Sequence, residues 1–491
     1  MSFVDWFRGV VLLAMAPKSK ANGNCSCSKE FAEGYMLLSH EDAHFFDLFA
    51  VLFSQNLGNR RFVDCHAEGA VEESFRHRFL IFVSVVLQKL LMRFAKPLAF
   101  FGSCFEILIN LLVLNGGFFR ILINLLTGHL VIPERDAPNY LSCIGNLDAR
   151  VKLDAIKRED CRYYASIAMM AAKASYENAA YLKGLITNQW KMEFVAFYDC
   201  WNEFQGKATT QLLVLLDKHE EHDTYVVAFR GTEPFDADAW CTDLDISWYG
   251  IPGIGKIHGG FMKALGLQKN VGWPKEIEWD ENVRPLAYYV VRDILRKGLS
   301  KNPNAKFILT GHSLGGALAI LYPTIMFLHD DKLLIERLEG IYTFGQPRVG
   351  DEAYTMFMRQ KLRENSIKYC RFVYCNDIVP RLPYDDKDLL FKHFGVCLFF
   401  NRRYELRVLD EEPNKNYFSP WCVIPMMLNA VLELIRSFTI AYINGPNYRE
   451  GWFLFGFRLF GLIIPGVSAH GPQDYINSTL LGSIEKHFKE D

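Results

Sequence analysis

Hydrophobic and polar positions follow different patterns in the two parts of this chain. After residue 140, short apolar runs alternate with amphipathic segments, at lengths typical of strands and helices. Residues 211–216 and 224–229 are aliphatic runs on either side of a polar turn, which predicts a hairpin. Such alternation predicts an α/β fold, in which helices cover a largely parallel sheet. The other segments predict helices at 165–180, 286–299 and 317–329 and strands at 306–309, 340–344 and 369–374.

The preceding region, residues 29–139, is more apolar. After a helix-like stretch at 45–53 come three long apolar runs, at 79–92, 97–114 and 118–132, and the hexamer Ile-Leu-Ile-Asn-Leu-Leu begins at both 107 and 121. Asn115-Gly116-Gly117 separates the two copies and predicts a helical hairpin. Neither arm has the roughly 20 uninterrupted apolar residues of a membrane span. The pattern favours insertion in the plane of a lipid surface, with buried core helices as the alternative.

Two further apolar segments, 421–443 and 452–467, come late in the chain. The first holds only two charged residues, Glu433 and Arg436, three positions apart, which predicts an amphipathic helix. The phenylalanines of the second suit an acyl-chain channel, a lipid contact or a packed core equally well.

Composition narrows the class of protein. The 491 residues carry 54 Lys and Arg against 56 Asp and Glu, so no basic excess points to nucleic acid. A mean hydropathy of +0.02 suits a globular body with a membrane-facing part. The twelve cysteines are irregularly spaced, which favours free thiols over a disulfide scaffold or a metal site. We interpret 1–28 as an irregular, non-targeting extension, although 1–16 has some features of a signal peptide, and 140–491 as one α/β domain.

The segment from Lys306 to Ala317 carries the strongest chemical signal. It places Gly311-His-Ser313-Leu-Gly315 between a predicted strand and a predicted helix, the context that a nucleophile elbow requires. Glycines on both sides of Ser313 permit the tight turn, and the helix N-terminus directs amide N–H groups at a developing oxyanion. The sequence therefore predicts a nucleophilic serine.

A nucleophilic serine needs a base and an orienting acid, which follow it along the chain in this order: Ser, Asp or Glu, His. Asp377 stands directly after a predicted strand and is preferred over Asp351, Asp385 and Asp386. For the base, His470 lies in a loop with freedom to reach the sheet edge, and is preferred over His393 and His487. His312 adjoins the serine but points away from it, which favours a structural role.

With these residues the chain resembles the class 3 lipases of the α/β-hydrolase superfamily, and most of all the plant oil-body triacylglycerol lipases. The matching stretches are Phe229-Arg-Gly231-Thr232, His258-Gly-Gly-Phe261, Gly311-His-Ser-Leu-Gly315, Phe344-Gly-Gln-Pro-Arg348-Val-Gly350, Asn376-Asp-Ile-Val-Pro-Arg-Leu-Pro383 and His470. The resemblance implies an α/β-hydrolase fold, a Ser313–Asp377–His470 triad, and oxyanion donors at Thr232 and the Leu314 N–H. It implies no metal or cofactor.

The resemblance also implies a mobile lid at 234–257, where aromatic residues alternate with four aspartates and predict one apolar and one acidic face. The expected reaction is hydrolysis of triacylglycerol at the surface of a lipid droplet (oil body) or of the endoplasmic reticulum, with the catalytic domain facing the cytosol. The alternatives are a phospholipase A1 or galactolipase acting on membrane lipids, and an inactive lipid-droplet protein. A homo-oligomer stays open.

Overall fold

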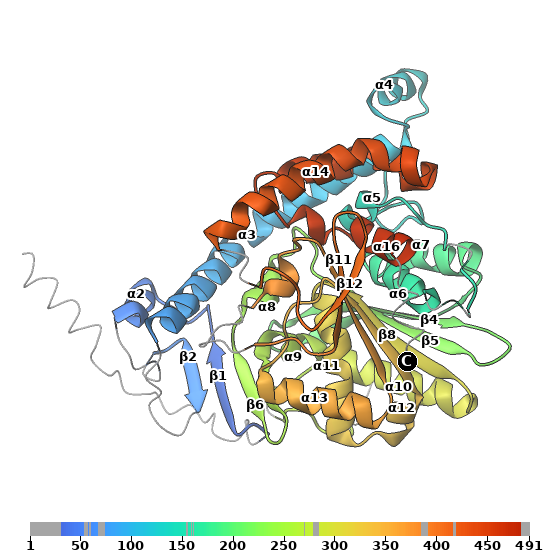
Figure 1. Ribbon diagram of the computed structural model, residues 1–491. Helices are drawn as coiled ribbons and strands as arrows, with labels where there is room; N and C mark the ends of the chain where they lie inside the picture. The colour runs from blue at the N-terminus through green and yellow to red at the C-terminus, as the bar shows by residue number, and fades with distance from the viewer. Residues whose placement is uncertain are drawn as a thin grey trace, which may run out of the picture.

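The computed structural model describes residues 31–53, 57, 60–66, 74–153, 156–158, 160, 162–269, 271–277, 284–383, 391–415 and 419–482. Two sheets organise these residues (Figure 1). The larger has the strand order β12-β11-β10-β9-β8-β5-β4-β3, and its five central strands from β11 to β5 are parallel. The smaller has the order β2-β1-β6-β7 and is antiparallel.

The strands of the larger sheet are β3 (Glu193–Asn202), β4 (Lys207–Asp217), β5 (Thr224–Phe229), β8 (Lys306–His312), β9 (Leu338–Phe344), β10 (Lys368–Tyr374), β11 (Val396–Phe400) and β12 (Leu406–Leu409). Those of the smaller sheet are β1 (Gly34–Leu38), β2 (Val63–His66), β6 (Trp248–Ile251) and β7 (Gly255–His258). The α-helices before the nucleophile elbow are α2 (Phe45–Phe53), α3 (Phe75–Leu114), α4 (Phe118–Thr127), α5 (Cys143–Leu147), α6 (Tyr163–Ala174), α7 (Ala179–Gly184), α8 (Ala237–Leu244), α9 (Gly259–Leu265) and α10 (Ala287–Lys301). Those after it are α11 (Leu314–His329), α12 (Lys332–Arg337), α13 (Glu352–Glu364), α14 (Pro420–Asn444), α15 (Trp452–Gly461) and α16 (Pro472–Leu481).

Helices cover both faces of the larger sheet. Side chains alternate along its strands, so that Val227 and Phe229 pack with α9, α10 and α11 while Val226 and Ala228 pack with α6 and α16. The two cores therefore lie on opposite faces of the sheet. The predicted α/β class with a mostly parallel sheet is confirmed.

One predicted helix is interrupted. The run 165–180 forms α6, which ends at Ala174, and α7, which begins at Ala179. The break has a local cause, since Asn178 caps α7 by accepting a hydrogen bond from the Tyr181 N–H at 2.8 Å. An asparagine that bonds the backbone in this way favours a helix start over a helix interior.

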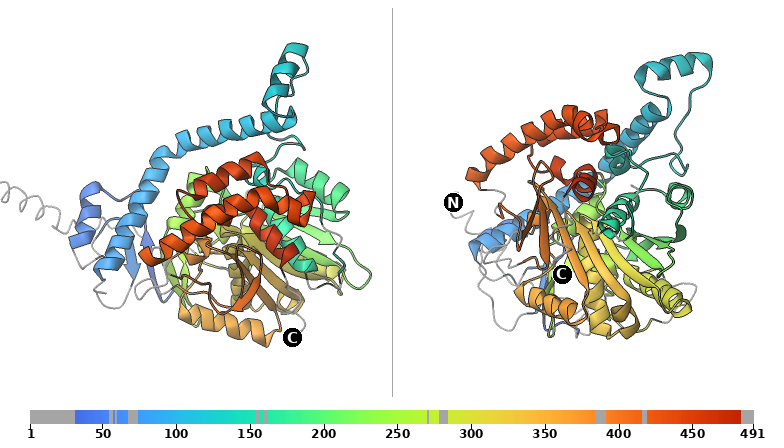
Figure 2. Two further views of the ribbon diagram at one scale, coloured as in Figure 1. Left: turned by 45° about the horizontal axis from the view of Figure 1, so that its top comes forward. Right: turned by 45° about the vertical axis from the view of Figure 1, so that its right-hand side comes forward.

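The N-terminal apolar region differs from the expectation of three separate runs. Residues 79–92 and 97–114 belong to one helix of 40 residues, α3, which continues through Pro97 and changes direction along its length (Figure 2). A proline inside a helix removes one backbone hydrogen bond and favours such a bend. The break at Asn115-Gly116-Gly117 is present, and Gly116 and Gly117 have positive φ. Beyond it, α4 stands out from the body and has no buried residue.

Large apolar side chains are exposed in one part of the molecule. Among the described residues, all but six of those exposed lie in α2, α3, α4, α14, α15 or the short segments after α4 and α15. We call the exposed side chains of α3, α4, α14 and α15 the apolar face. Both α3 and α14 are long and apolar enough to cross a membrane by length and composition alone. The six exceptions are Tyr198, Trp240, Val271, Leu328, Met356 and Val408.

The polar side chains of α3 point in a different direction from its exposed apolar ones. Ser84 Oγ donates to the Leu244 carbonyl at 2.6 Å, Asn110 exchanges two hydrogen bonds with Leu141, and Glu106 accepts from the Cys143 N–H at 2.8 Å. These bonds attach α3 to the α/β body along most of its length. A helix attached in this way lies along the body and presents only its outer face.

Candidate active site

Ser313 sits on a strained turn between β8 and α11. Its φ is 58° and its ψ is −130°, a conformation that a side-chain-bearing residue adopts only when its surroundings impose it, at a cost of about 1–3 kcal/mol. A Cβ at Gly311 would overlap the backbone of Gly315, and one at Gly315 would overlap the Phe229 carbonyl. The two glycines therefore let strand, turn and helix approach closely enough to hold the serine at the carboxyl edge of the sheet.

Asp377 and His470 form a pair beside this turn. His470 Nδ1 donates to Asp377 Oδ2 at 2.8 Å, and Asp377 is fully buried. Both pack against the backbone of Gly345, where a Cβ would lie 2.8 Å from Asp377 Oδ2 and 2.9 Å from the imidazole. The preceding residue, Phe344, accepts a hydrogen bond from the Ser313 N–H at 2.9 Å. Phe344 and Gly345, at the end of β9, thus bring the serine and the Asp–His pair together. Among the described residues, no hydrogen bond joins Ser313 Oγ to His470.

His312 holds the loop that carries His470. Its Nε2 bonds the His470 carbonyl oxygen at 2.8 Å, its Nδ1 bonds the Tyr176 hydroxyl at 3.1 Å, and the two imidazoles stack at 4.5 Å. Burial lowers the pKa of His312 well below its usual value, which keeps the ring neutral. A neutral ring with Nε2–H as donor and Nδ1 as acceptor satisfies both contacts. His312 is therefore a support of the His470 loop.

The competing candidates lie elsewhere. Asp351 caps α13 by accepting from the Tyr354 N–H at 2.9 Å. His393 is buried, with Nε2 on the Pro380 carbonyl oxygen at 2.7 Å. The remaining three, Asp385, Asp386 and His487, lie outside the described residues.

Thr232 follows β5 and sits beside the elbow. A Cβ on its neighbour Gly231 would lie 3.1 Å from Ser313 Cβ, so this stretch packs directly against the nucleophile turn. Leu314 is the first residue of α11, so its N–H has no partner within the helix and is free for an oxyanion. Thr232 and Leu314 thus come from two elements that meet at Ser313.

A buried carboxyl group contacts Thr232. Thr232 Oγ1 lies 2.6 Å from Asp243 Oδ2, while Asp243 Oδ1 is buried and has no hydrogen-bond partner among the described residues. Burial raises the pKa of Asp243 to about 7, against the smaller opposite effects of Thr232 and His470. The four aspartates of 234–257 were expected to share one acidic face, and the burial of Asp243 beside Thr232 contradicts this expectation.

The predicted lid, 234–257, is only partly a helix-and-loop segment. Its first part forms α8, whereas Trp248–Ile251 is β6 and pairs with both β1 and β7. Asp245 is also buried and binds Lys263 at 2.7 Å, whereas Asp236 and Asp238 are half-buried, so the four aspartates do not form one exposed acidic face. The apolar side of the segment contacts α3, where the ring of Phe235 lies over Gly102.

Tyr475 was missed by sequence reasoning. Its hydroxyl donates to Asp377 Oδ2 at 2.5 Å, the same oxygen that accepts from His470. Burial raises the pKa of Tyr475 well above its usual value, so the phenol stays protonated and can donate. Its position five residues after His470 gave no pattern that would have singled it out.

Comparison with known proteins identifies the family of this chain. The family model "Lipase (class 3)" matches residues 226–387, which include Ser313 and Asp377. The triacylglycerol lipase OBL1 of Nicotiana tabacum is 39% identical, over 91% of this chain and 94% of the relative. The chain belongs to the class 3 lipase family. Proteins of the same name from Arabidopsis thaliana and Ricinus communis are 42% and 33% identical to this class 3 lipase, over 84% and 91% of its length and 86% and 95% of theirs.

Solved lipase structures match part of the chain. The lipase of Rhizopus microsporus var. chinensis is 24% identical, with a TM-score of 0.35, over 54% of this chain and 80% of that one. The triacylglyceride lipase of Rhizomucor miehei is 21% identical, with a TM-score of 0.36, over 50% and 82%.

Proposed function

We propose that this class 3 lipase hydrolyses the ester bonds of triacylglycerol, with Ser313 as nucleophile, His470 as base and Asp377 as orienting acid. The observation that carries the proposal is the placement of the Asp377–His470 pair at 2.8 Å against Gly345, next to the strained Ser313 turn. The near full-length similarity to plant triacylglycerol lipases supports the choice of substrate.

The reaction proceeds in two steps. Ser313 Oγ attacks the ester carbonyl while His470 Nε2 takes the hydroxyl proton, and His470 then gives this proton to the departing glyceride oxygen. An acyl-serine remains. Water attacks it, His470 takes a proton from the water and returns it to Ser313, and the fatty acid leaves. Asp377 stays ionised throughout and stabilises the imidazolium that forms at each step.

The oxyanion is stabilised at the junction of β5 and α11. In this scheme the Leu314 N–H and Thr232 are the oxyanion donors, because Leu314 follows Ser313 in the chain and the stretch that carries Thr232 packs against the Ser313 turn. Removing one such donor in a comparable site costs about 3–4 kcal/mol of transition-state stabilisation. Since no metal or cofactor takes part in this scheme, these two residues supply the charge stabilisation of the reaction.

We place the enzyme on the surface of a lipid droplet or of the endoplasmic reticulum, with the catalytic domain on the cytosolic side. The apolar face supports this proposal, because contiguous exposed apolar surface of such extent marks a lipid or protein contact. The hydrogen bonds of Ser84, Glu106 and Asn110 to the body favour a helix that lies in the lipid surface over one that crosses it.

The test is release of fatty acid from a triolein emulsion by the wild type and by Ser313→Ala. The wild type is expected to hydrolyse triolein, and the variant to keep its circular-dichroism spectrum and thermal midpoint while losing hydrolysis. Activity retained by Ser313→Ala would refute the nucleophile. Faster hydrolysis of phosphatidylcholine or galactolipid vesicles than of triolein would replace the substrate class by that of a phospholipase A1 or a galactolipase.

A further inference from the structure

α14 has two faces of opposite character. Trp421 and Ile424 on its outer side are 89% and 77% exposed, and belong to the apolar face. Its two charged residues, Glu433 and Arg436, turn instead toward the lipase body, where their side chains are 4% and 14% exposed. The helix therefore contacts the body through charged groups rather than through a purely apolar seam.

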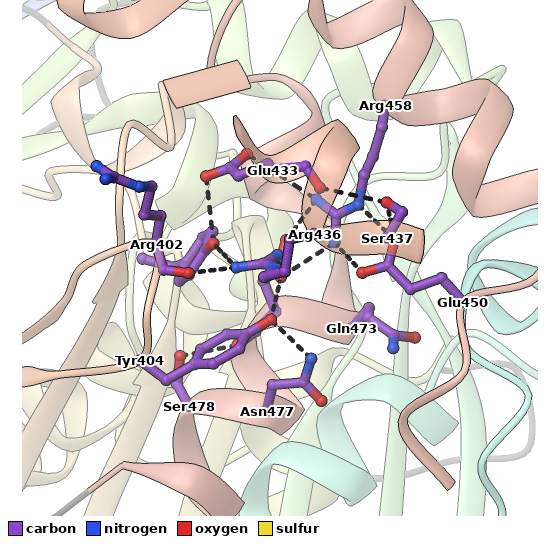
Figure 3. Close-up of polar contacts among 12 residues, drawn as sticks. Arg402, Tyr404, Glu433, Arg436, Ser437, Glu450, Arg458, Gln473, Asn477 and Ser478 are labelled. Atoms are coloured by element: carbon purple, nitrogen blue, oxygen red, sulfur yellow. Dashed lines mark hydrogen bonds and ion pairs between the residues drawn. The ribbon is translucent and has the colours of Figure 1, made fainter. Parts of the chain in front are cut away.

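These charged groups converge on Asp474. Asp474 Oδ1 accepts hydrogen bonds from Arg436 Nη2 at 2.6 Å, Tyr404 Oη at 2.7 Å and Arg458 Nη2 at 3.2 Å. Arg458, from α15, also donates to both carboxylate oxygens of Glu450 at 2.5 and 2.6 Å. Figure 3 shows Glu433, Arg436, Glu450 and Arg458 gathered at one point beneath α14 and α15. We call Glu433, Arg436, Glu450, Arg458 and Asp474 the ionic cluster.

The ionic cluster lies between the apolar face and the elements that carry the Asp–His pair. Asp474 is in the first turn of α16, four residues after His470 and directly before Tyr475, the donor to Asp377. On the other side, Arg436 Nη1 donates to the hydroxyl of Tyr374 at 2.7 Å. Tyr374 is the last residue of β10, three positions before Asp377.

Stability alone is a weak reason for such a cluster. Taking charged groups out of water is costly, and well-packed apolar residues of similar volume often stabilise a protein equally well. What fixed ion pairs add is directional geometry, because each planar guanidinium fork accepts only a few arrangements of its partners. The pairs of Arg436 and Arg458 fix the first turn of α16 relative to α14 and α15.

We propose that Asp474 is a positioning residue for His470, held in place by Arg436 and Arg458 from the helices of the apolar face. The inference rests on the proposed function of Ser313 and His470. Displacement of α16 moves Tyr475 from Asp377 and the imidazole from the serine, and a misplacement of about 1 Å in a catalytic group can cost up to about 10²-fold in rate.

The decisive variant is Asp474→Asn in the full-length protein. It removes one of three carboxylates, so that two carboxylates then face two guanidinium groups and no positive charge is left without a counter-charge. The substrate is p-nitrophenyl butyrate in solution, which needs no lipid surface. Active serines are counted by the stoichiometric release of nitrophenolate from a p-nitrophenyl alkylphosphonate, so that kcat is expressed per competent site.

The matched control is Asp331→Asn. Asp331 is also a buried aspartate at the start of a helix, α12, and binds Arg296 at 2.9 Å, but α12 lies far from α14 (Figure 1). If a substituted aspartate only stabilises the fold, its loss lowers the number of titrated sites and the thermal midpoint, but leaves kcat per titrated site unchanged. If the aspartate positions His470, its loss lowers kcat per titrated site.

For Asp474→Asn we expect kcat per titrated site to fall at least fivefold with KM within twofold, and for Asp331→Asn we expect both constants to be unchanged. Equal kcat per site in Asp474→Asn and wild type would overturn the proposal. Should Asp474→Asn not fold, Arg436→Lys decides by the same measurement, since it keeps the charge and loses only the fork. A wild type that neither reacts with the phosphonate nor hydrolyses the ester refutes the proposed function instead.

Discussion

Asp243 should give this enzyme an alkaline loss of activity that a single substitution removes. An ionised carboxylate can only accept, so above the pKa of Asp243 the Thr232 hydroxyl must donate its proton to Oδ2, 2.6 Å away. A protonated Asp243 can donate to Thr232 Oγ1 instead, which frees the threonine proton for the oxyanion. The carboxamide of Asp243→Asn can take the same donor role and does not ionise.

The magnitude follows from a pKa of about 7 for Asp243. At pH 8 about one tenth of the wild-type carboxyl groups carry a proton, so the variant should be about tenfold more active there and equally active at pH 5. The raised pKa of Asp243 also makes the free energy of unfolding depend on pH. The pKa is 3.8 in the unfolded chain and higher in the fold, so the protein loses stability as pH rises from 3.8 through 7, by about 4 kcal/mol in all.

The assay is kcat/KM on p-nitrophenyl butyrate from pH 5 to 9, corrected for spontaneous hydrolysis, with thermal midpoints at pH 5 and 8. Asp243→Asn should lose the alkaline limb near pH 7 and gain more thermal stability at pH 8 than at pH 5. The control is Asp238→Asn, on the same helix, where the aspartate binds Lys207 at the surface at 2.7 Å. An unchanged alkaline limb in Asp243→Asn would refute the assignment of the hydroxyl as an oxyanion donor.

Two further changes test the neighbouring parts of the structure. Tyr475→Phe removes a hydrogen bond to the Asp377 carboxylate, which is worth about 1.5–3 kcal/mol; kcat per titrated site should fall about tenfold at unchanged KM, and a value within twofold of wild type would contradict the role of the phenol. Trp421→Ser with Ile424→Ser removes two exposed side chains of the apolar face, each worth about 1.5–3 kcal/mol when buried in lipid. Flotation with triolein droplets should fall at least tenfold, whereas Met356→Ser, at a 62% exposed side chain on α13, should float like the wild type.

Local pattern was enough to predict the strand–turn–helix around Ser313 and the position of Asp377 after a strand. Strand, Gly-x-Ser-x-Gly and helix follow one another within residues 306–329, so the position of Ser313 depends on few distant contacts. Asp377 could be found because a strand end fixes where a side chain emerges. The choice of His470 over His393 rested on its loop and on the family resemblance, since the two histidines are separated in space by how later elements pack.

Contacts between residues that are distant in the chain could not be predicted from the sequence. The burial of Asp243 depends on α3 and Thr232, and the role of Tyr475 depends on the approach of α16 to the end of β10. Amphipathicity along α14 was predicted correctly, but a 3.6-residue period does not reveal whether Glu433 and Arg436 face water or a buried aspartate. Whether a charged residue of an amphipathic helix faces water or is buried in an ion pair can be decided only when its partners are known.

The segment after Thr232 and the helices that carry the apolar face pack together. Phe235, three residues after Thr232, fills the space over Gly102 of α3, and its ring meets Phe101 and Phe105 edge to face at 5.6 and 5.8 Å. Phe105 in turn contacts Phe453 of α15 at 5.7 Å. The segment after Thr232 therefore cannot leave Ser313 without either leaving α3 or moving with it. Because α3 carries exposed apolar surface on its other side, the helix that we propose to meet lipid also holds this segment.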